Sequence, residues 1–407
     1  MCNKKILLIH HSGLIGGAGI SLFYTWMALK KQYNVVCYIP NNPSDLWMFL
    51  KERGLNPRTF PFRLGKLTYY SGGNKLINPK FWYHAFNSLF QISYWKKVIN
   101  EEQPDLVIVN SKVLCWMGIV FKALNKKSLC FVRETIPENP ENIINRLMRC
   151  MLDTFTMVAF LSEYDLNQTR LKKAESVVSP DFLEVANYED KLGRKIACQN
   201  INISSNSFNV LFVGGMDKLK GIDLLVKAAN IIKNEDITFI VAGKDFGDAP
   251  IKSVKSLFKK IKIRENIKFA RGIKAYIKNQ CIENKIKFIG IKKDISIAFS
   301  ACDVLVFPMK EPHQARPAFE IGVQKKPVII TNFSNVREFV KDGYNGLTFE
   351  PNNPKQLAKA ILKLKNDKEL LEKLGENNYK YTMKYHTESY AMDMLIKKID
   401  EILEEER

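Results

Sequence analysis

The sequence predicts an α/β protein made of two doubly wound, Rossmann-like domains that face a central cleft. Its 407 residues exceed the length at which one hydrophobic core usually keeps growing, so two domains of about 200 residues are expected. Short apolar strands alternate with helical stretches along most of the chain, which is typical of parallel sheets covered on both faces. The polar, aperiodic tract Tyr188–Ser207 is the natural connection between the two halves.

The expected strands are short apolar runs followed by turn or polar residues. In the first half they are Lys5–His11, Asn34–Pro40, Asp105–Asn110, Ser128–Glu134 and Thr156–Ser162. In the second half they are Asn209–Gly215, Ile237–Gly243, Ile286–Ile291, Asp303–Pro308, Pro327–Thr331 and Gly346–Phe349. We therefore expect a first domain at residues 1–200, a second at 201–380, and a long terminal helix from about Glu376 onward.

A glycine-rich loop follows the first strand and contains Gly16 and Gly17, just before a predicted helix. Glycines at a helix start let backbone amides approach an anionic ligand closely. A dinucleotide site would also need an acidic residue at the end of the second strand, and that strand ends in Ile39-Pro40-Asn41-Asn42. The sequence therefore argues against a nicotinamide cofactor, and we expect no cofactor.

The stretch Asp303–Thr331 predicts a strand, a loop, a short helix and a second strand. Pro317 suits the first position of that helix, because the N–H that proline lacks would have no partner there. Polar side chains that can bind a ligand gather around this loop and helix: Glu311, His313, Arg316 and Glu320. They follow the carboxyl end of a buried parallel strand, which is where open α/β sheets bind ligands.

This stretch resembles the donor-sugar signature of the GT-B glycosyltransferases of family four, also called group 1. Glu311-Pro312 opens the signature, Glu320 closes it, and Pro327-Val328 stands seven residues after Glu320. The two Glu residues stand nine apart, whereas the family pattern has eight. The resemblance implies that Glu311 or His313 faces the donor sugar, and the altered spacing leaves open which of them does.

The resemblance extends to other positions. Lys220-Gly221 match the family's diphosphate-binding Lys-Gly, while Gly215 stands where the family has an Arg, so Arg316 becomes the candidate for the second diphosphate contact. Gly16 and Gly17 match the loop that faces the donor phosphate. The resemblance further implies that Glu320 binds the ribose hydroxyls, that Ile291 lies where the main chain touches the nucleobase, and that the terminal helix, at residues 381–407, returns to the first domain.

The implied activity is that of a retaining, hexosyltransferase-like enzyme of surface polysaccharide synthesis. It would move a sugar from a nucleotide-sugar donor to a glycan or lipid-linked saccharide acceptor. No metal is expected, because no two Asp residues stand two apart and the five His residues lack ligand spacing. Two alternatives remain: an epimerase of the same fold that acts on a UDP-sugar, and a basic nucleic-acid-binding protein. The leading hypothesis includes no nucleic-acid partner.

The net charge of +20 is concentrated in the segment Ile251–Lys293, which holds fourteen Lys or Arg and two acidic residues. We call it the basic segment; it is either a solvated helix packed on its own domain or a surface that rests on anionic lipid. The eight Cys residues form no Cys-x-x-Cys pair, and we find neither a signal sequence nor an apolar run long enough to span a bilayer. We expect a cytoplasmic protein, peripheral at the inner face of the membrane if the second interpretation holds.

Three further features allow two interpretations each. The aromatic-rich stretch Lys66–Trp95 is interpreted mainly as core, with a mobile acceptor loop around Gly72-Gly73 as the alternative. Arg133-Glu134 follows a strand and either pairs internally, which we favour, or reaches the acceptor. His10-His11 either lines the cleft or is satisfied within the core.

Overall fold

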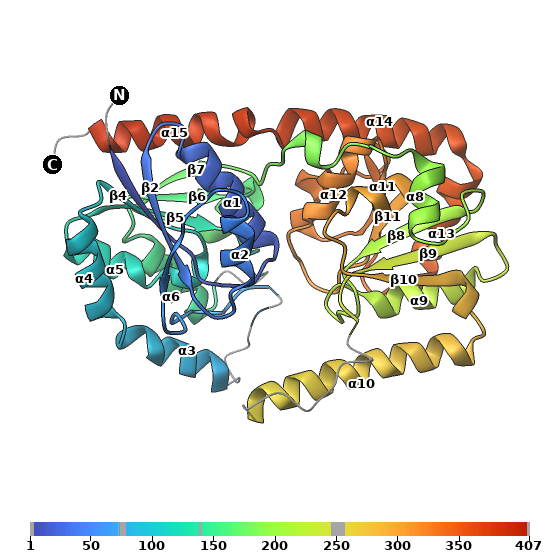
Figure 1. Cartoon of the computed structure of the whole chain (residues 1–407), viewed down its shortest axis with the longest axis horizontal. Helices are drawn as coiled ribbons and strands as arrows, with labels where there is room; N and C mark the ends of the chain where they lie inside the picture. The colour runs from blue at the N-terminus through green and yellow to red at the C-terminus, as the bar shows by residue number, and fades with distance from the viewer. Residues whose placement is uncertain (1–3, 72, 74–78, 138–140, 246–256, 405–407) are drawn as a thin grey trace. The chain divides into compact units, whose positions relative to one another are not determined.

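The computed structural model describes residues 4–71, 73, 79–137, 141–245 and 257–404, which form two compact units. Unit 1 comprises the chain up to Leu183 together with the segment from Tyr385 onward, and unit 2 comprises Glu184–Lys384 (Figure 1). Each unit contains one parallel sheet with helices on both faces. The prediction of two Rossmann-like domains is confirmed.

Unit 1 contains a seven-stranded parallel sheet of order β3-β2-β1-β4-β5-β6-β7. Its strands are β1 (Lys5–Ile9), β2 (Asn34–Pro40), β3 (Arg58–Phe60), β4 (Leu106–Val109), β5 (Lys127–Val132), β6 (Met157–Phe160) and β7 (Glu175–Val178). Its helices are α1 (Gly17–Leu29), α2 (Asp45–Lys51), α3 (Pro79–Leu89), α4 (Ile92–Glu102), α5 (Met117–Ala123), α6 (Ile143–Leu152), α7 (Glu163–Thr169) and α15 (Glu388–Glu404), with the 3-10 turn η1 (Lys112–Leu114).

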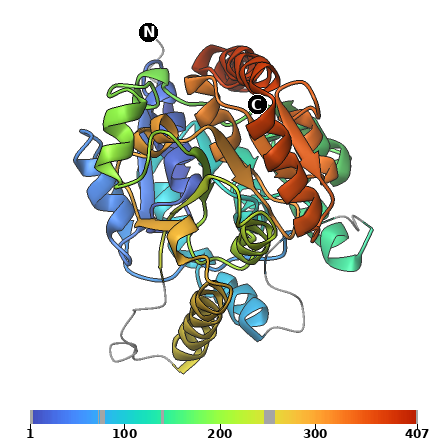
Figure 2. The ribbon, with the colours of Figure 1, turned by 90° about the vertical axis from the view of Figure 1, so that its right-hand side faces the viewer.

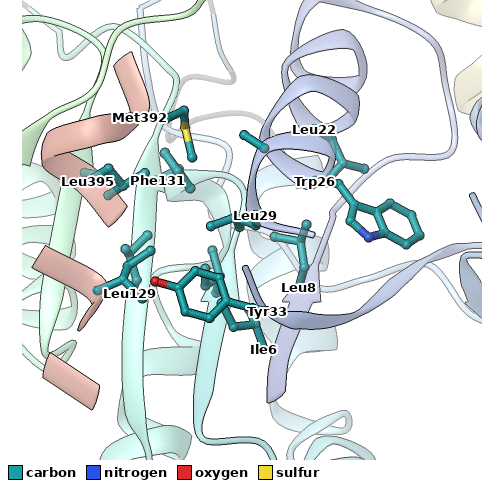
Figure 3. Close-up of a cluster of buried hydrophobic side chains, with 14 of the residues drawn as sticks. Ile6, Leu8, Leu22, Trp26, Leu29, Tyr33, Leu129, Phe131, Met392 and Leu395 are labelled. Atoms are coloured by element: carbon teal, nitrogen blue, oxygen red, sulfur yellow. The ribbon is translucent and has the colours of Figure 1, made fainter. Parts of the chain in front are cut away.

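Alternate residues of the unit 1 strands point to opposite faces of the sheet and into two separate cores. Leu8 of β1 joins a core with α1, α2 and α15, whereas its neighbour Leu7 joins one with α3, α4, α5 and α6. Figure 3 shows Met392 and Leu395 of α15 beside Phe131 of β5 in the first of these cores. Helix α15 is thus part of the hydrophobic core of unit 1.

Unit 2 contains a six-stranded parallel sheet of order β10-β9-β8-β11-β12-β13. Its strands are β8 (Phe208–Val213), β9 (Ile237–Ala242), β10 (Ile286–Gly290), β11 (Val304–Phe307), β12 (Val328–Thr331) and β13 (Gly346–Phe349). Its helices are α8 (Arg194–Asn200), α9 (Ile222–Ile231), α10 (Leu257–Asn279), α11 (Ser296–Ala301), α12 (Arg316–Glu320), α13 (Pro354–Asn366) and α14 (Lys368–Tyr385), with the 3-10 turns η2 (Val185–Asn187), η4 (Glu283–Lys285), η5 (Ile321–Gln324) and η6 (Ser334–Glu338). Figures 1 and 2 show α10 as the outermost helix of unit 2, on the side of α9.

Two expected boundaries differ from the structure. The units divide between Leu183 and Glu184, earlier than the expected division near residue 200, because α8 is bound to the second sheet. Arg194 of α8 donates to both carboxylate oxygens of Asp303, at 2.8 and 2.9 Å, next to the start of β11. The expected long terminal helix is two helices, α14 and α15, which are separated at residues 386–387.

Candidate functional site

Three neighbouring strands of unit 2 end in glycines with positive φ: Gly215 (+60°) after β8, Gly243 (+130°) after β9 and Gly290 (+69°) in β10. The amide of Gly243 donates to the carbonyl of Gly290 at 2.8 Å, so the strand ends stay joined. A Cβ on Gly215 would lie 2.5 Å from the backbone nitrogen of Lys244. This position therefore cannot hold the Arg that the family has here without a backbone rearrangement.

The loop after β8 holds Lys220 against the end of β11. Gly221 has φ +83°, and a Cβ on it would lie 1.7 Å from the carbonyl oxygen of Pro308. The backbone therefore packs there as only glycine allows, and α9 begins at the next residue. Lys220 is half-buried, and its Nζ lies 4.9 Å from the ring centroid of Phe307, the last residue of β11.

The Lys220 ammonium has no hydrogen bond or ion pair with any described residue other than its contact with the Phe307 ring. Burial lowers its pKa to about 8, and the opposing charge of Asp217 limits the shift. A desolvated lysine at the end of a buried strand and the start of a helix suits an anionic ligand. Its neighbour Lys218, in contrast, is exposed to solvent.

Glu311 and His313 lie in the loop after β11, and both side chains are exposed. Asn335 donates to the carbonyl of His313 at 3.1 Å, and Thr331 donates to the carbonyl of Met309 at 2.8 Å, which anchors the loop backbone. The crowded surroundings of the imidazole, and next the charge of Lys220, lower the pKa of His313. The ring is therefore neutral at pH 7 even though part of it meets solvent, and it lies within range of the Lys220 charge.

Arg316 and Glu320 lie one turn apart on α12 and form a buried ion pair, with Nε and Oε1 2.8 Å apart. Tyr188 also donates its hydroxyl to Oε1 of Glu320, at 3.0 Å. The two charged residues are 9% and 8% exposed. The helix thus fixes the backbone of Glu320, and the two hydrogen-bond donors fix its carboxylate.

The helix itself differs from the expectation. Pro317 is the second residue of α12 rather than the first, and α12 has five residues before the 3-10 turn η5 continues it. A dipole from so few aligned peptides is small, so the positive potential here comes mainly from side chains. Ile291 directly follows β10, the edge strand, and is 73% exposed.

Gly16 and Gly17 belong to unit 1, where Gly16 precedes the first residue of α1. Both are exposed, and a Cβ on either would meet no atom within 4 Å. Local packing therefore does not require glycine at either position. Of the predicted site residues, unit 2 brings together Lys220 with His313 and Arg316 with Glu320.

A second polar cluster, which the sequence did not indicate as a unit, follows β1, β4 and β5 of unit 1. The Arg133 guanidinium donates to Asn110 Oδ1, Asp181 Oδ1 and Thr25 Oγ1, at 2.8, 2.8 and 2.9 Å. Asn110 Oδ1 is thereby an acceptor, so its Nδ2 is the donor to His10 Nδ1, at 3.1 Å. His10 is fully buried, and burial, with the charges of Arg133 and Lys66, lowers its pKa to about 3.

Glu134 does not pair with Arg133 but accepts from the Ser111 hydroxyl and from the Lys112 amide. The favoured prediction of an internal Arg133-Glu134 pair is wrong, because the Arg133 guanidinium binds Asn110, Asp181 and Thr25 instead. Burial raises the pKa of Glu134 and lowers that of Lys112. The sequence did contain one signal for this second cluster: His10, Asn110 and Arg133 each directly follow a strand.

The basic segment is described in part. In α10, Ile267, Ile273 and Ile277 pack into the core of unit 2, while Arg271 and Lys278 are exposed. The part of α10 with described side chains thus matches the solvated helix packed on its own domain. Lys252 and Lys255 lie outside the described residues, as does Gly72 of the suggested acceptor loop. No described helix combines the length and the apolar character that crossing a bilayer requires.

Two parallel α/β units in one chain, with a C-terminal helix that returns to the core of the first, define the GT-B fold. Solved structures support this. The chain aligns with Anabaena Alr3699/HepE, solved in complex with UDP, at a TM-score of 0.77 and 17% identity over 98% of this chain and 100% of that chain. It aligns with sucrose-phosphate synthase from Thermosynechococcus elongatus at a TM-score of 0.74 and 20% identity, again over 98% and 100%.

Residues 194–381 match the family described as glycosyl transferases group 1. The chain is 35% identical to the uncharacterized glycosyltransferase MJ1178 of Methanocaldococcus jannaschii over 184 residues. These residues are 45% of this chain and 45% of that one. It is 26% identical to the putative glycosyltransferase YtcC of Bacillus subtilis over 77% of this chain and 70% of that one. The first curated relatives are matched over about half of their length. The resemblance to group 1 is confirmed for this part of the chain.

Proposed function

We propose that this protein transfers a sugar from a nucleotide-sugar donor to a saccharide acceptor. The observation that carries the proposal is Lys220, a half-buried ammonium with a lowered pKa at the carboxyl end of a parallel sheet, inside the region that matches group 1. Such a charge is costly to bury without a partner. A donor diphosphate would supply that partner.

Each site residue then has a role. Lys220 and the amides of Gly16 and Gly17 hold the diphosphate and stabilise the charge that grows on it as the glycosidic bond breaks. The Glu320 carboxylate, already oriented by Arg316 and Tyr188, accepts hydrogen bonds from the ribose hydroxyls. Glu311 or the neutral His313 contacts the sugar, and the backbone at Ile291 borders the nucleobase.

We further propose that transfer retains the configuration of a hexose, needs no metal, and builds a surface polysaccharide on a glycan or lipid-linked acceptor in the cytoplasm. Retention and the acceptor class follow from the resemblance to group 1. The structure of Alr3699/HepE was solved with UDP, which favours a UDP-sugar as the first donor to try. The basic segment remains a candidate for contact with an anionic membrane, since its exposed Arg271 and Lys278 carry positive charge.

The experiment is a thermal-shift screen with UDP-, GDP- and ADP-sugars. A donor at 100 times its dissociation constant should add about 2.7 kcal/mol to the free energy of unfolding. Lys220→Ala should lose most of this effect, whereas Lys218→Ala, in the same loop but exposed, should keep it. No shift with any donor, or equal shifts in both variants, would contradict the proposed site.

Activity is then tested with the donor that binds. Release of free nucleotide that depends on an added saccharide acceptor indicates transfer. Release without an acceptor, together with a change in the sugar, would indicate the epimerase instead. The anomeric configuration of the product, read by NMR, decides between retention and inversion.

A further inference from the structure

Helix α3 has two apolar faces, and only one of them packs on unit 1. Phe81 and Ser88 are 4% and 5% exposed and lie on the packed side with Ala85. The fit there is close, because a Cβ on Gly65 would lie 2.4 Å from the Cα of Ser88. Gln91, after the helix, donates to the carbonyl of Arg63 at 2.8 Å and fixes the neighbouring loop against it. The packed face therefore holds α3 in place without using the rest of its apolar surface.

The opposite face exposes large apolar side chains over two turns. Its members are Trp82 (52% exposed), Tyr83 (60%), Phe86 (63%), Leu89 (61%) and, in the turn that follows, Phe90 (78%). At 3.6 residues per turn these five cover about a third of the helix circumference. We call them the α3 aromatic face. A contiguous exposed patch of this kind marks a binding surface, whereas isolated exposed apolar residues are common.

The sequence segment that contains α3 carries only positive charge. From Arg53 to Asn100 the sequence contains no Asp or Glu and eight Lys or Arg residues. Five of the eight are exposed in the structure: Arg53, Arg58, Arg63, Lys96 and Lys97. Arg63 lies beside the C-terminal end of α3, through the hydrogen bond that its carbonyl accepts from Gln91. A partner surface that complements this face is therefore negatively charged and accepts aromatic rings.

We propose that the α3 aromatic face docks unit 1 on an anionic lipid bilayer. Trp and Tyr side chains favour the boundary between headgroups and acyl chains, because each has an apolar ring and one polar group. An amphipathic helix lying in this boundary binds through apolar area and through attraction between basic residues and anionic lipid. This inference does not depend on the proposed transfer reaction, since it rests on a surface outside the candidate site.

The basic segment is a weaker candidate for the same role. In the described part of α10 the apolar side chains are buried in unit 2, so what remains exposed is mainly charge. Charge alone gives attraction that fades as salt shortens the Debye length. The α3 aromatic face adds apolar contact, which salt does not screen. We therefore place the bilayer contact on α3.

Trp82 provides a direct probe. The chain has five Trp residues, and Trp26, Trp95 and Trp116 are at most 6% exposed while Trp47 is half-buried. We expect the full-length protein to float with phosphatidylcholine vesicles that contain phosphatidylglycerol and not with phosphatidylcholine alone. The emission of Trp82 should shift to shorter wavelength on binding. Trp82→Phe should keep the flotation and lose the shift.

The deciding variant replaces Trp82, Phe86 and Phe90 with Ser. It should reduce the partition coefficient for anionic vesicles by about tenfold or more without changing the melting temperature, because all three side chains are exposed. A matched control, Tyr390→Ser with Met394→Ser on α15, removes side chains that are 49% and 53% exposed and should bind as the wild type does. A second comparison, Arg271→Glu with Lys278→Glu on α10, should also keep binding.

Several results would overturn the proposal. The wild type could fail to float with anionic vesicles at low salt, or the triple Ser variant could float as well as the wild type. The emission could stay unchanged in vesicle-bound protein, which would place the contact elsewhere. Ultracentrifugation could also show a wild-type dimer that the triple variant cannot form, with neither protein binding vesicles, which would make this face an interface between two copies.

Discussion

Glu320 is bound to Arg316 across one turn of α12, with Oε1 and Nε 2.8 Å apart and both residues buried. The same oxygen accepts from Tyr188. In a buried ion pair, the loss of one partner leaves the other charge uncompensated, which typically costs about 3–5 kcal/mol. Glu320 thus has two functions to separate: it neutralises Arg316, and it is the candidate ligand for the ribose.

The first prediction separates these functions. Glu320→Ala should lower the free energy of unfolding by about 3 kcal/mol, because Arg316 stays charged and buried. The double variant Arg316→Leu, Glu320→Leu should recover much of this loss in chemical denaturation, since no lone charge remains. It should still lose the donor-induced thermal shift. A double variant with a wild-type donor shift and turnover would leave Glu320 with the structural function alone.

The second prediction concerns pH. The Lys220 pKa of about 8 lies below its ordinary value of 10.5, so between these values the unfolded chain binds more protons than the native one. The free energy of unfolding of the donor-free protein should therefore rise as pH increases through this window. Donor affinity should change in the opposite direction, because the ammonium that binds the diphosphate is lost above about pH 8.

Lys220→Arg tests the same group, since a guanidinium stays protonated throughout. In this variant the pH dependence of donor affinity above about pH 8 should disappear, whatever its absolute affinity. Donor titrations by calorimetry at about pH 7 and about pH 9 provide the comparison. A wild-type affinity equal at both values would show that Lys220 does not bind the phosphate.

Most of the fold followed from the apolar runs, because a strand buried on both faces of a parallel sheet must be apolar throughout. The two strands that were missed, β3 and β7, are the edges of the unit 1 sheet. Each has exposed residues at its start, Arg58 and Thr59 in β3 and Glu175 and Ser176 in β7, so it lacks the continuous apolar signal. The boundary near residue 200 was misplaced for a different reason: the Arg194–Asp303 contact joins residues far apart in sequence.

Only part of the candidate site could be predicted from the sequence. Lys220 and Glu320 could be identified because a motif fixes their spacing. The partner of Glu320 at Tyr188 could not, since it lies in the connecting tract and reaches α12 only through the fold. The same holds for the contact of Arg133 with Asp181. Both contacts depend on which strands become neighbours in the sheets, and local sequence patterns do not specify this.

The third prediction addresses the pair Glu311 and His313, whose motif spacing leaves their roles open. His313 has a lowered pKa and should stay neutral from about pH 5 upward, so its contribution to turnover should not titrate there. If His313 contacts the sugar, His313→Ala should reduce kcat/KM by about tenfold or more, and Glu311→Ala should have a small effect. The reverse order in steady-state kinetics would assign the contact to Glu311.

The last prediction concerns Arg133, whose guanidinium joins Asp181, Thr25 and Asn110 and, through Asn110, fixes the ring of His10. Arg133 and Asp181 form an ion pair at 2.8 Å with side chains 5% and 15% exposed. Asp181→Asn removes the counter-charge and should lower the free energy of unfolding by about 3 kcal/mol in urea denaturation. Glu101→Gln, in the exposed Lys97–Glu101 pair at 3.7 Å, is the control and should cost less than about 1 kcal/mol.

The same cluster can be tested through the ring of His10. In ¹⁵N NMR, His10 should carry its proton on Nε2, because Nδ1 accepts from Asn110. Arg133→Leu frees the Asn110 amide to turn and should change that tautomer ratio; an unchanged His10 spectrum would show that Arg133 does not orient the amide.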